Sequence, residues 1–252
     1  ANLNINKQSF IKFDGKLMNA GVYFLKQKIL KKIPKRDISL ENDILTNLIQ
    51  KKSIKGKIIK SNFIDIGTYK NINLVKNNFH KQFERPAAFL DRDGVINYDY
   101  GYVNKVKDFD LKTNVIKGLK YLNKKNYNIF IVTNQSGIAR GIFTEKDYLR
   151  FYKLIKNFFF RRKCYINDMQ YCPYMKGALV KKYDKITKLR KPGNLMILNL
   201  MKKWFLNKKQ SFMIGDQLTD KLAANKSELY FEYSSNDFYN QVKKIIFQLN
   251  KK

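Results

Sequence analysis

A short apolar run that ends in two aspartates constrains this chain more than any other stretch. Residues 87–90 are followed by Asp91 and Asp93, one residue apart, and then by Gly94. In an open α/β sheet, ligands bind beyond the carboxyl ends of the strands, which is where these aspartates would lie. Their spacing turns both carboxylates to one side of extended backbone, and Gly94 lets the chain turn away sharply.

Two crowded carboxylates repel each other unless a divalent cation lies between them or one of them holds a proton. Both conditions are met in a phosphatase that attacks phosphorus with one carboxylate and delivers a proton with the other. A solvated Asp-x-Asp-Gly turn would contain the same residues. This stretch alone therefore does not decide between the two interpretations.

The length and composition indicate a folded protein. The chain has 252 residues, of which 44% are hydrophobic, and this is enough for one large or two small domains. Its two cysteines exclude a disulfide framework and favour a reducing compartment. No apolar run reaches the roughly 18 residues of a membrane span, and no signal peptide opens the chain. We therefore expect a soluble, cytoplasmic protein without a membrane partner.

The charge balance raises the question of a nucleic-acid partner. The chain has 51 basic and 20 acidic residues, a net charge of +31, and such a charge is typical of proteins that bind nucleic acid. Here the lysines are scattered among Asn, Ile, Phe and Tyr, all of which have A/T-rich codons, whereas a binding face would concentrate them. We expect no nucleic-acid partner. A degenerate, non-enzymatic module with a basic surface is the alternative from another class.

The chain divides at a polar linker, residues 81–86, which ends in proline. Residues 1–80 predict strands over 17–24 and 54–59, and helices over 40–50, capped by Ser39, and over 68–79. Residues 87–252 alternate strand and helix, which predicts a parallel sheet with right-handed crossovers. Strands are expected over 87–90, 128–132, 168–171 and 211–214, and helices over 114–125, 144–160, 193–206 and 236–249.

Three runs in the first domain resemble the carboxyl-terminal part of sugar-1-phosphate nucleotidyltransferases of the heptose and mannose type. They are residues 19–23, 39–43 and 63–68. The resemblance implies that Asp65 stands at a vestigial metal position of that family. The family's glycine-rich nucleotide loop and first metal-binding aspartate have no counterpart here. We therefore expect an incomplete domain without nucleotidyltransferase activity, and a plain structural turn at Asp65 is the alternative.

Four polar features follow the predicted strands of the second domain. They are Asp91 with Asp93, the hydroxyl of Thr133, the pair Arg190 and Lys191, and Asp216 with Asp220. Phosphoryl transfer needs a nucleophile, donors around the phosphoryl oxygens, a cation and a metal ion. The chain supplies a candidate for each. Mg²⁺ keeps several waters, so two carboxylates and one backbone carbonyl suffice to bind it.

This order of residues resembles the haloacid dehalogenase superfamily of aspartate-dependent phosphatases. Within it, residues 89–97, 99–103 and 132–141 are similar to the family of D-glycero-D-manno-heptose 1,7-bisphosphate 7-phosphatases. The resemblance implies an α/β fold with a Rossmann-like parallel sheet and a minimal cap. It also implies a Mg²⁺-dependent phosphomonoesterase that acts on a small phosphorylated sugar in heptose and lipopolysaccharide biosynthesis. Histidinol-phosphatase, or another small sugar-phosphate phosphatase, is the alternative within the enzyme class.

The resemblance also implies roles for individual residues. Asp91 would be the nucleophile that forms an aspartyl-phosphate, and Asp93 the general acid and then base. Asp220 would orient Lys191 or the metal-bound waters. The residues expected to hold the phosphoryl group and the substrate are Thr133, Lys191, Asn134 and Arg190. The expected Mg²⁺ ligands are Asp91, the backbone carbonyl of Asp93, and Asp216.

The chain departs from this family at the position of a zinc loop. The family often has Cys-Pro-His on one arm of the loop and Cys-x-Cys on the other, before the Arg-Lys pair. Here the first arm is Cys172-Pro-Tyr, and residues 187–189 are Thr-Lys-Leu. One thiolate cannot form the four-coordinate site that zinc requires. We expect no zinc, and a loop over 173–189 that is held by packing or is mobile.

Overall fold

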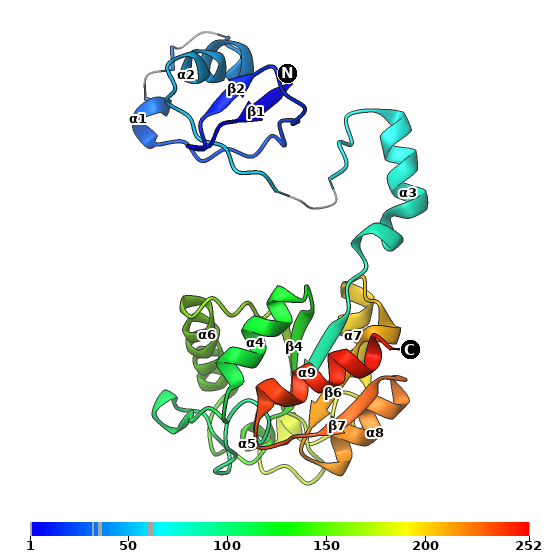
Figure 1. The fold of residues 1–252 in the computed structure, drawn as a ribbon. Helices are drawn as coiled ribbons and strands as arrows, with labels where there is room; N and C mark the ends of the chain where they lie inside the picture. The colour runs from blue at the N-terminus through cyan, green and yellow to red at the C-terminus, as the bar shows by residue number, and fades with distance from the viewer. Residues whose placement is uncertain (1, 32, 35–36, 60–62, 252) are drawn as a thin grey trace. The chain divides into compact units, whose positions relative to one another are not determined.

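The computed structural model describes residues 2–31, 33–34, 37–59 and 63–251, with the backbone alone over 77–83. The chain forms two compact units, Ala1–Phe79 and His80–Lys252 (Figure 1). None of the helices in the described part of the chain is long and apolar enough to cross a membrane.

The first unit has a two-stranded antiparallel sheet and short helices. Its elements are β1 (Leu3–Ile5), β2 (Ile11–Phe13), α1 (Gln27–Leu30), a π-helical turn η1 (Leu40–Leu45), α2 (Thr46–Gln50) and the start of α3 (Tyr69–Phe83). The predicted helix over 40–50 is confirmed, and the Ser39 side chain accepts the Asn42 amide at its start. Helix α3 extends beyond the predicted end, so the linker expected over 81–86 is helical through residue 83.

The strands predicted over 17–24 and 54–59 are wrong. Leu17 and Lys55 each form a single bridge, with Leu3 and Phe10 respectively, and no ladder continues from either. A strand is stable only when a neighbour pairs with it along its length. Among the described residues of this unit, Leu45 is the one buried hydrophobic side chain, so little core is available to hold further strands.

The second unit contains the predicted parallel sheet, which is confirmed. The strands are β3 (Ala87–Leu90), β4 (Asn128–Asn134), β5 (Asp168–Cys172), β6 (Phe212–Gly215) and β7 (Tyr230–Tyr233), in the order β5-β4-β3-β6-β7. In the register, Leu90 at the end of β3 lies opposite Ile131 of β4 and Ile214 of β6. The carboxyl ends of these three strands therefore lie side by side.

Helices cover both faces of this sheet (Figure 1). They are α4 (Val115–Lys124), α5 (Ser136–Ala139), α6 (Glu145–Arg161), α7 (Leu195–Lys203), α8 (Leu218–Lys226) and α9 (Phe238–Leu249), with short turns η2 (Val106–Asp108), η3 (Lys181–Tyr183) and η4 (Lys208–Gln210). Ala88 and Leu90 pack with α4, α6 and α9, whereas Ala87 and Phe89 pack with α7 and α8. All four β3 residues are fully buried, as expected for a strand covered on both faces.

The local sequence explains how the helices begin. Thr144 and Asp147 form a capping box at the start of α6. The Thr144 hydroxyl accepts the backbone amide of Asp147, and the Asp147 carboxylate accepts the backbone amide of Thr144. Gln217 and Asp220 form another at the start of α8. The capping at Asp220 places an acidic side chain directly beneath the end of β6, where the polar site lies.

Candidate active site

Asp91 follows β3 directly and lies against a buried lysine. The Nζ atom of Lys191 is 3.0 Å from Oδ1 of Asp91 and 2.5 Å from Oδ1 of Asp220. It also donates to the carbonyl oxygen of Val132 at 3.0 Å. Lys191 is 3% exposed, and a buried ammonium group is tolerated only when it is paired in this way. The lysine thus joins the ends of β3 and β4 to the start of α8.

The acidic groups around this lysine are not fully neutralised. Burial raises the pKa of Asp91 to about 7, although the charge of Lys191 opposes the shift. Burial lowers the pKa of Lys191, but the carboxylates of Asp91 and Asp220 raise it further, and the net shift is upward. Burial also raises the pKa of Asp216. Three carboxylates, of Asp91, Asp216 and Asp220, surround one ammonium group, and this excess of negative charge favours the binding of an additional cation.

Asp93 is held by the arginine that precedes it. Arg92 is fully buried, and its Nη2 donates to the two Asp93 oxygens at 2.9 and 2.7 Å and to the carbonyl of Val103 at 2.6 Å. The guanidinium carbon lies 5.7 Å from the ring centre of Tyr148 and 5.3 Å from that of Phe151. These cation–π contacts and hydrogen bonds compensate the buried charge.

Sequence reasoning missed Arg92, although a signal was present. Arg92 stands between the two aspartates, directly after an apolar strand. A charged side chain pointing into the apolar interior must find a partner there. Asn97, also missed, donates from Nδ2 to Oδ1 of Asp93 at 2.9 Å.

The end of β4 supplies the next groups. Gln135, which the sequence analysis did not select, donates from Nε2 to the Thr133 hydroxyl at 2.9 Å and to Oδ2 of Asp93 at 3.2 Å. Thr133 is therefore brought close to Asp93. Asn134 accepts the amide of Lys191 at 3.0 Å and donates to its carbonyl at 3.1 Å, so in this structure it fixes the backbone of the buried lysine.

Arg190 lies at the edge of the same site. Its side chain is half-buried, and Nη1 donates to the carbonyl oxygen of Tyr174 at 3.3 Å. One of five N–H donors is used in this bond, and the guanidinium can still bind an anion.

The carboxylates can hold a divalent metal ion. Oxygens of Asp91, Asp216 and Asp220 lie within 4.8 Å of one another. The two Asp220 oxygens are already engaged, one by Lys191 and the other by the amides of Asp216 and Gln217 at 3.2 and 3.0 Å. Asp91 and Asp216 are thus the carboxylates best placed to bind a cation. An all-oxygen set suits Mg²⁺.

The turn after Asp93 packs directly on the Asp216 side chain. Gly94 has a φ of +77°, and a Cβ atom there would lie 2.4 Å from Oδ2 of Asp216. Only glycine permits this approach without strain. The turn at Gly94 consequently lies beside the Asp216 carboxylate.

Asp65 and the two cysteines are not among the side chains that form this site. Asp65 is exposed in the first unit, and its Oδ1 accepts the Gly67 amide at 2.9 Å in a local turn. Cys164 and Cys172 are both buried with free thiols. The Sγ of Cys172 contacts the Tyr174 carbonyl at 3.8 Å.

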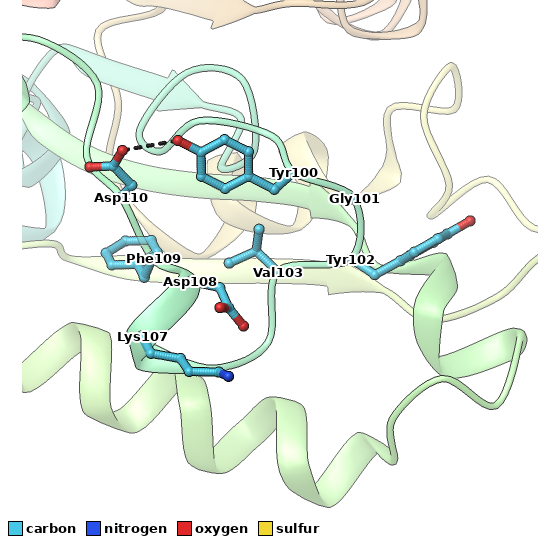
Figure 2. Close-up of a pocket in the computed structure, with 8 residues that line it drawn as sticks. All are labelled: Tyr100, Gly101, Tyr102, Val103, Lys107, Asp108, Phe109 and Asp110. Atoms are coloured by element: carbon cyan, nitrogen blue, oxygen red, sulfur yellow. Dashed lines mark hydrogen bonds between the residues drawn. The ribbon is translucent and has the colours of Figure 1, made fainter.

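A hollow of about 660 Å³ lies in the loop that follows the two aspartates, over residues 100–110 (Figure 2). Tyr100 donates to Oδ2 of Asp110 across it at 3.0 Å, while the ring of Tyr102 points away from the hollow. Val103 joins this loop to the site because its carbonyl accepts from Arg92. The loop is short, and the described residues of this unit form no separate cap domain.

Comparison with known proteins identifies the family. A model of the family described as polynucleotide kinase 3 phosphatase matches residues 88–249. The D-glycero-beta-D-manno-heptose-1,7-bisphosphate 7-phosphatase of Rhodopseudomonas palustris is 35% identical over 168 residues, which cover 66% of this chain and 93% of that protein. The chain belongs to the haloacid dehalogenase superfamily, in the branch that holds the heptose-bisphosphate phosphatases. Its catalytic unit is a phosphoric monoester hydrolase.

Further relatives agree with this assignment. The D-glycero-beta-D-manno-heptose-1,7-bisphosphate 7-phosphatase of Photorhabdus laumondii is 40% identical over 144 residues, which cover 57% of this chain and 77% of that protein. The fold resembles the crystal structure of D,D-heptose 1,7-bisphosphate phosphatase from B. bronchiseptica, which is complexed with magnesium and phosphate. That comparison has a TM-score of 0.57 and 18% identity and covers 65% of this chain and 99% of the other.

Proposed function

We propose that this chain removes the 7-phosphate of D-glycero-D-manno-heptose 1,7-bisphosphate through an aspartyl-phosphate on Asp91. The observation that carries the chemistry is the contact between Asp91 and Lys191, at 3.0 Å, beside Asp93 and Thr133 at the edge of the sheet. The substrate follows from the names of the relatives, which match the catalytic unit over most of their own lengths.

In the first step, a carboxylate oxygen of Asp91 attacks phosphorus, and the bond from phosphorus to the sugar oxygen breaks. The sugar oxygen leaves with a proton from Asp93. The bonds from Arg92 and Gln135 fix the Asp93 carboxylate where it can deliver that proton. In the second step, water attacks the phosphorus of the aspartyl-phosphate and gives a proton to Asp93. Phosphate leaves, and the Asp91 carboxylate is restored.

Lys191 and Thr133 bind the phosphoryl oxygens in this proposal. Lys191 is anchored by Asp220 as well as by Asp91, so its ammonium group is already oriented before the phosphate arrives, which is the preorganisation that electrostatic stabilisation requires. Asp91, the carbonyl of Asp93 and Asp216 would hold Mg²⁺. When bound, Mg²⁺ neutralises charge on the phosphoryl group.

The first domain adds no second reaction. We expect residues 1–80, interpreted as the carboxyl-terminal part of a nucleotidyltransferase-like domain, to show no nucleotidyl transfer. Asp65 accepts a backbone amide in an exposed turn, and the large side chains of Val22 and Phe24 are 70% and 98% exposed. An assay for nucleotide transfer onto heptose 1-phosphate tests this expectation.

A substrate panel tests the proposed function. It contains both anomers of heptose 1,7-bisphosphate, histidinol phosphate and an oligonucleotide with a 3′-phosphate, each with Mg²⁺. We expect kcat/KM for one heptose bisphosphate to exceed that for histidinol phosphate about 100-fold, the ratio expected when a charged contact to the substrate is lost. Equal or faster release of phosphate from histidinol phosphate would contradict the heptose assignment.

The oligonucleotide tests a second candidate substrate. The description of the matching family names a polynucleotide 3′-phosphatase, and the chain carries a net charge of +31. If a polynucleotide is the substrate, its turnover should exceed that of the heptose bisphosphates and fall steeply as salt is added. We expect the opposite order, because the lysines are not concentrated in one run of the sequence.

A further inference from the structure

A carboxylate outside the catalytic group accepts two tyrosine hydroxyls. Glu145, at the start of α6, accepts the hydroxyl of Tyr171 at 2.8 Å and that of Tyr183 at 2.9 Å, one on each carboxylate oxygen. Tyr171 belongs to the edge strand β5, and Tyr183 belongs to η3 in the loop that follows it. Glu145 therefore ties the loop to the body of the sheet.

The loop over residues 173–189 is folded around Tyr183. That tyrosine is 7% exposed, and its carbonyl accepts the amide of Met175 at 3.1 Å. The amide of Val180 donates to the carbonyl of Ala139 at 3.0 Å. The described contacts thus hold this loop by packing and hydrogen bonds, one of the two outcomes expected from the sequence.

The same loop sets the position of Arg190. The rings of Tyr183 and Tyr174 have their centroids 6.0 Å apart, and the Tyr174 carbonyl accepts from Nη1 of Arg190 at 3.3 Å. Arg190 directly precedes Lys191, which contacts Asp91. A continuous set of contacts therefore runs from Glu145 to the edge of the catalytic site.

The charge of Glu145 strengthens this connection. Burial raises the pKa of Glu145, but the hydroxyls of Tyr171 and Tyr183 lower it further, and the net shift is downward. The side chain is ionised at neutral pH, and both hydroxyls make charge-assisted bonds to it. Lys182 lies 3.6 Å away and is largely exposed, so it adds little.

We propose that Glu145 is a positioning residue that acts through Tyr183 and Tyr174 to hold Arg190 against the remote phosphate of the substrate. This inference rests on the proposed function, since it requires a substrate with a second anionic group. Lys191 and Thr133 serve the reacting phosphate, and Arg190 is left for a group farther along the sugar.

Substrates with and without the remote phosphate separate positioning from general damage. In Glu145→Gln and Tyr183→Phe, KM for heptose 1,7-bisphosphate should rise about tenfold with kcat little changed, the effect of losing about one charge-assisted hydrogen bond. Heptose 7-phosphate, which lacks the remote phosphate, should react with unchanged constants. The double variant should resemble Glu145→Gln, because the two side chains act as one unit.

The chain offers a matched control on the opposite edge of the sheet. Glu232 of β7 accepts the hydroxyl of Tyr230 at 2.7 Å, and Glu232→Gln should leave both substrates unaffected. An equal rise in KM for both substrates, or a loss confined to kcat, would overturn the positioning role of Glu145.

Limited proteolysis tests the loop independently of activity. Lys176, Lys181 and Lys185 are exposed in it, and trypsin cleavage at them reports how often the loop opens. Cleavage should be about tenfold faster in Glu145→Gln than in Glu232→Gln, with both variants melting as the unaltered protein does. Unchanged cleavage would refute the proposal. An unaltered protein that hydrolyses neither heptose phosphate would instead refute the proposed function, and the cleavage rates would still decide whether Glu145 holds the loop.

Discussion

Lys191 places its ammonium group 3.0 Å from the carboxylate of Asp91, and both side chains are almost entirely buried. The pair is not isolated, because Asp220 holds the lysine from the other side. A buried cation between two carboxylates fixes the nucleophile, and its positive charge attracts an incoming phosphate.

Replacing Lys191 by methionine should damage both stability and catalysis. Removing one partner of a buried ion pair leaves uncompensated charge and costs about 3–5 kcal/mol of unfolding free energy, while loss of one preorganised donor lowers kcat about 10²–10³-fold. Chemical denaturation and steady-state kinetics measure the two effects. The matched control is Lys208→Met, which breaks an exposed pair with Glu228 and should change neither quantity. Equal behaviour of the two variants would contradict the role given to Lys191.

The raised pKa of Asp91 predicts how stability depends on pH. Its pKa rises from 3.8 in the unfolded chain to about 7 in the metal-free fold, so between these values the folded state holds a proton that the unfolded state has released. The metal-free protein should therefore lose stability as pH rises from about 4 to about 7 and then level off. Denaturation curves across this range, with Asp91→Asn as the control that lacks the slope, measure the effect.

Mg²⁺ competes with that proton for the same carboxylate. The increase in melting temperature caused by Mg²⁺ should thus be larger at about pH 8 than at about pH 6, and removal of the metal with a chelator should reverse it. Stabilisation by Mg²⁺ that does not depend on pH would show that Asp91 is not a ligand.

Gly94→Ala should weaken Mg²⁺ binding. A methyl group there would lie 2.4 Å from Oδ2 of Asp216, and the φ of +77° adds backbone strain of about 1–2 kcal/mol. Gly101→Ala isolates the strain, because Gly101 has a φ of +78° with no heavy atom near its Cβ position. Both variants should lose stability, and only Gly94→Ala should also lose Mg²⁺ affinity, as titration calorimetry would show. Similar affinity in the two variants would remove Gly94 and Asp216 from the metal site.

Elemental analysis tests the expected absence of zinc. Cys172 is buried with its sulfur against the Tyr174 carbonyl, and the family's other ligand positions hold residues that cannot replace thiolate or imidazole. The purified protein should contain no stoichiometric zinc, and its activity should survive a zinc-selective chelator. One equivalent of tightly bound zinc would contradict this expectation.

The sequence predicted the site residues that stand at the carboxyl ends of strands. Asp91, Thr133 and Asp216 each follow an apolar run of a parallel sheet, and strands of one sheet end at one edge. Lys191 was selected as one of the polar residues between the predicted strands and helices, but its burial between Asp91 and Asp220 depends on tertiary packing. The strand β7 and the helix α8 were missed because α8 has no clear apolar face and β7 is only partly buried and contains the charged residue Glu232.

Other features were decided by distant contacts. Gln135 holds Asp93 through a bond that joins the end of β4 to the end of β3, and no local periodicity reports such a bond. In the first unit, the apolar runs near Leu17 and Ile54 have strand-like sequences, yet few partners pair with them. Their conformation was set by what surrounds them, which a single sequence does not contain.

The central claim is that Asp91 becomes phosphorylated during turnover. Asp93→Asn should lower kcat about 10²–10⁴-fold, the usual contribution of general acid–base catalysis, and should let the covalent intermediate accumulate because its hydrolysis loses the base. The measurement is an acid quench of Asp93→Asn with substrate radiolabelled in the reacting phosphate, followed by peptide mapping. We predict label on the peptide that contains Asp91, and none when Asp91→Asn is combined with Asp93→Asn. Turnover by Asp91→Asn alone, or label on any other residue, would contradict it.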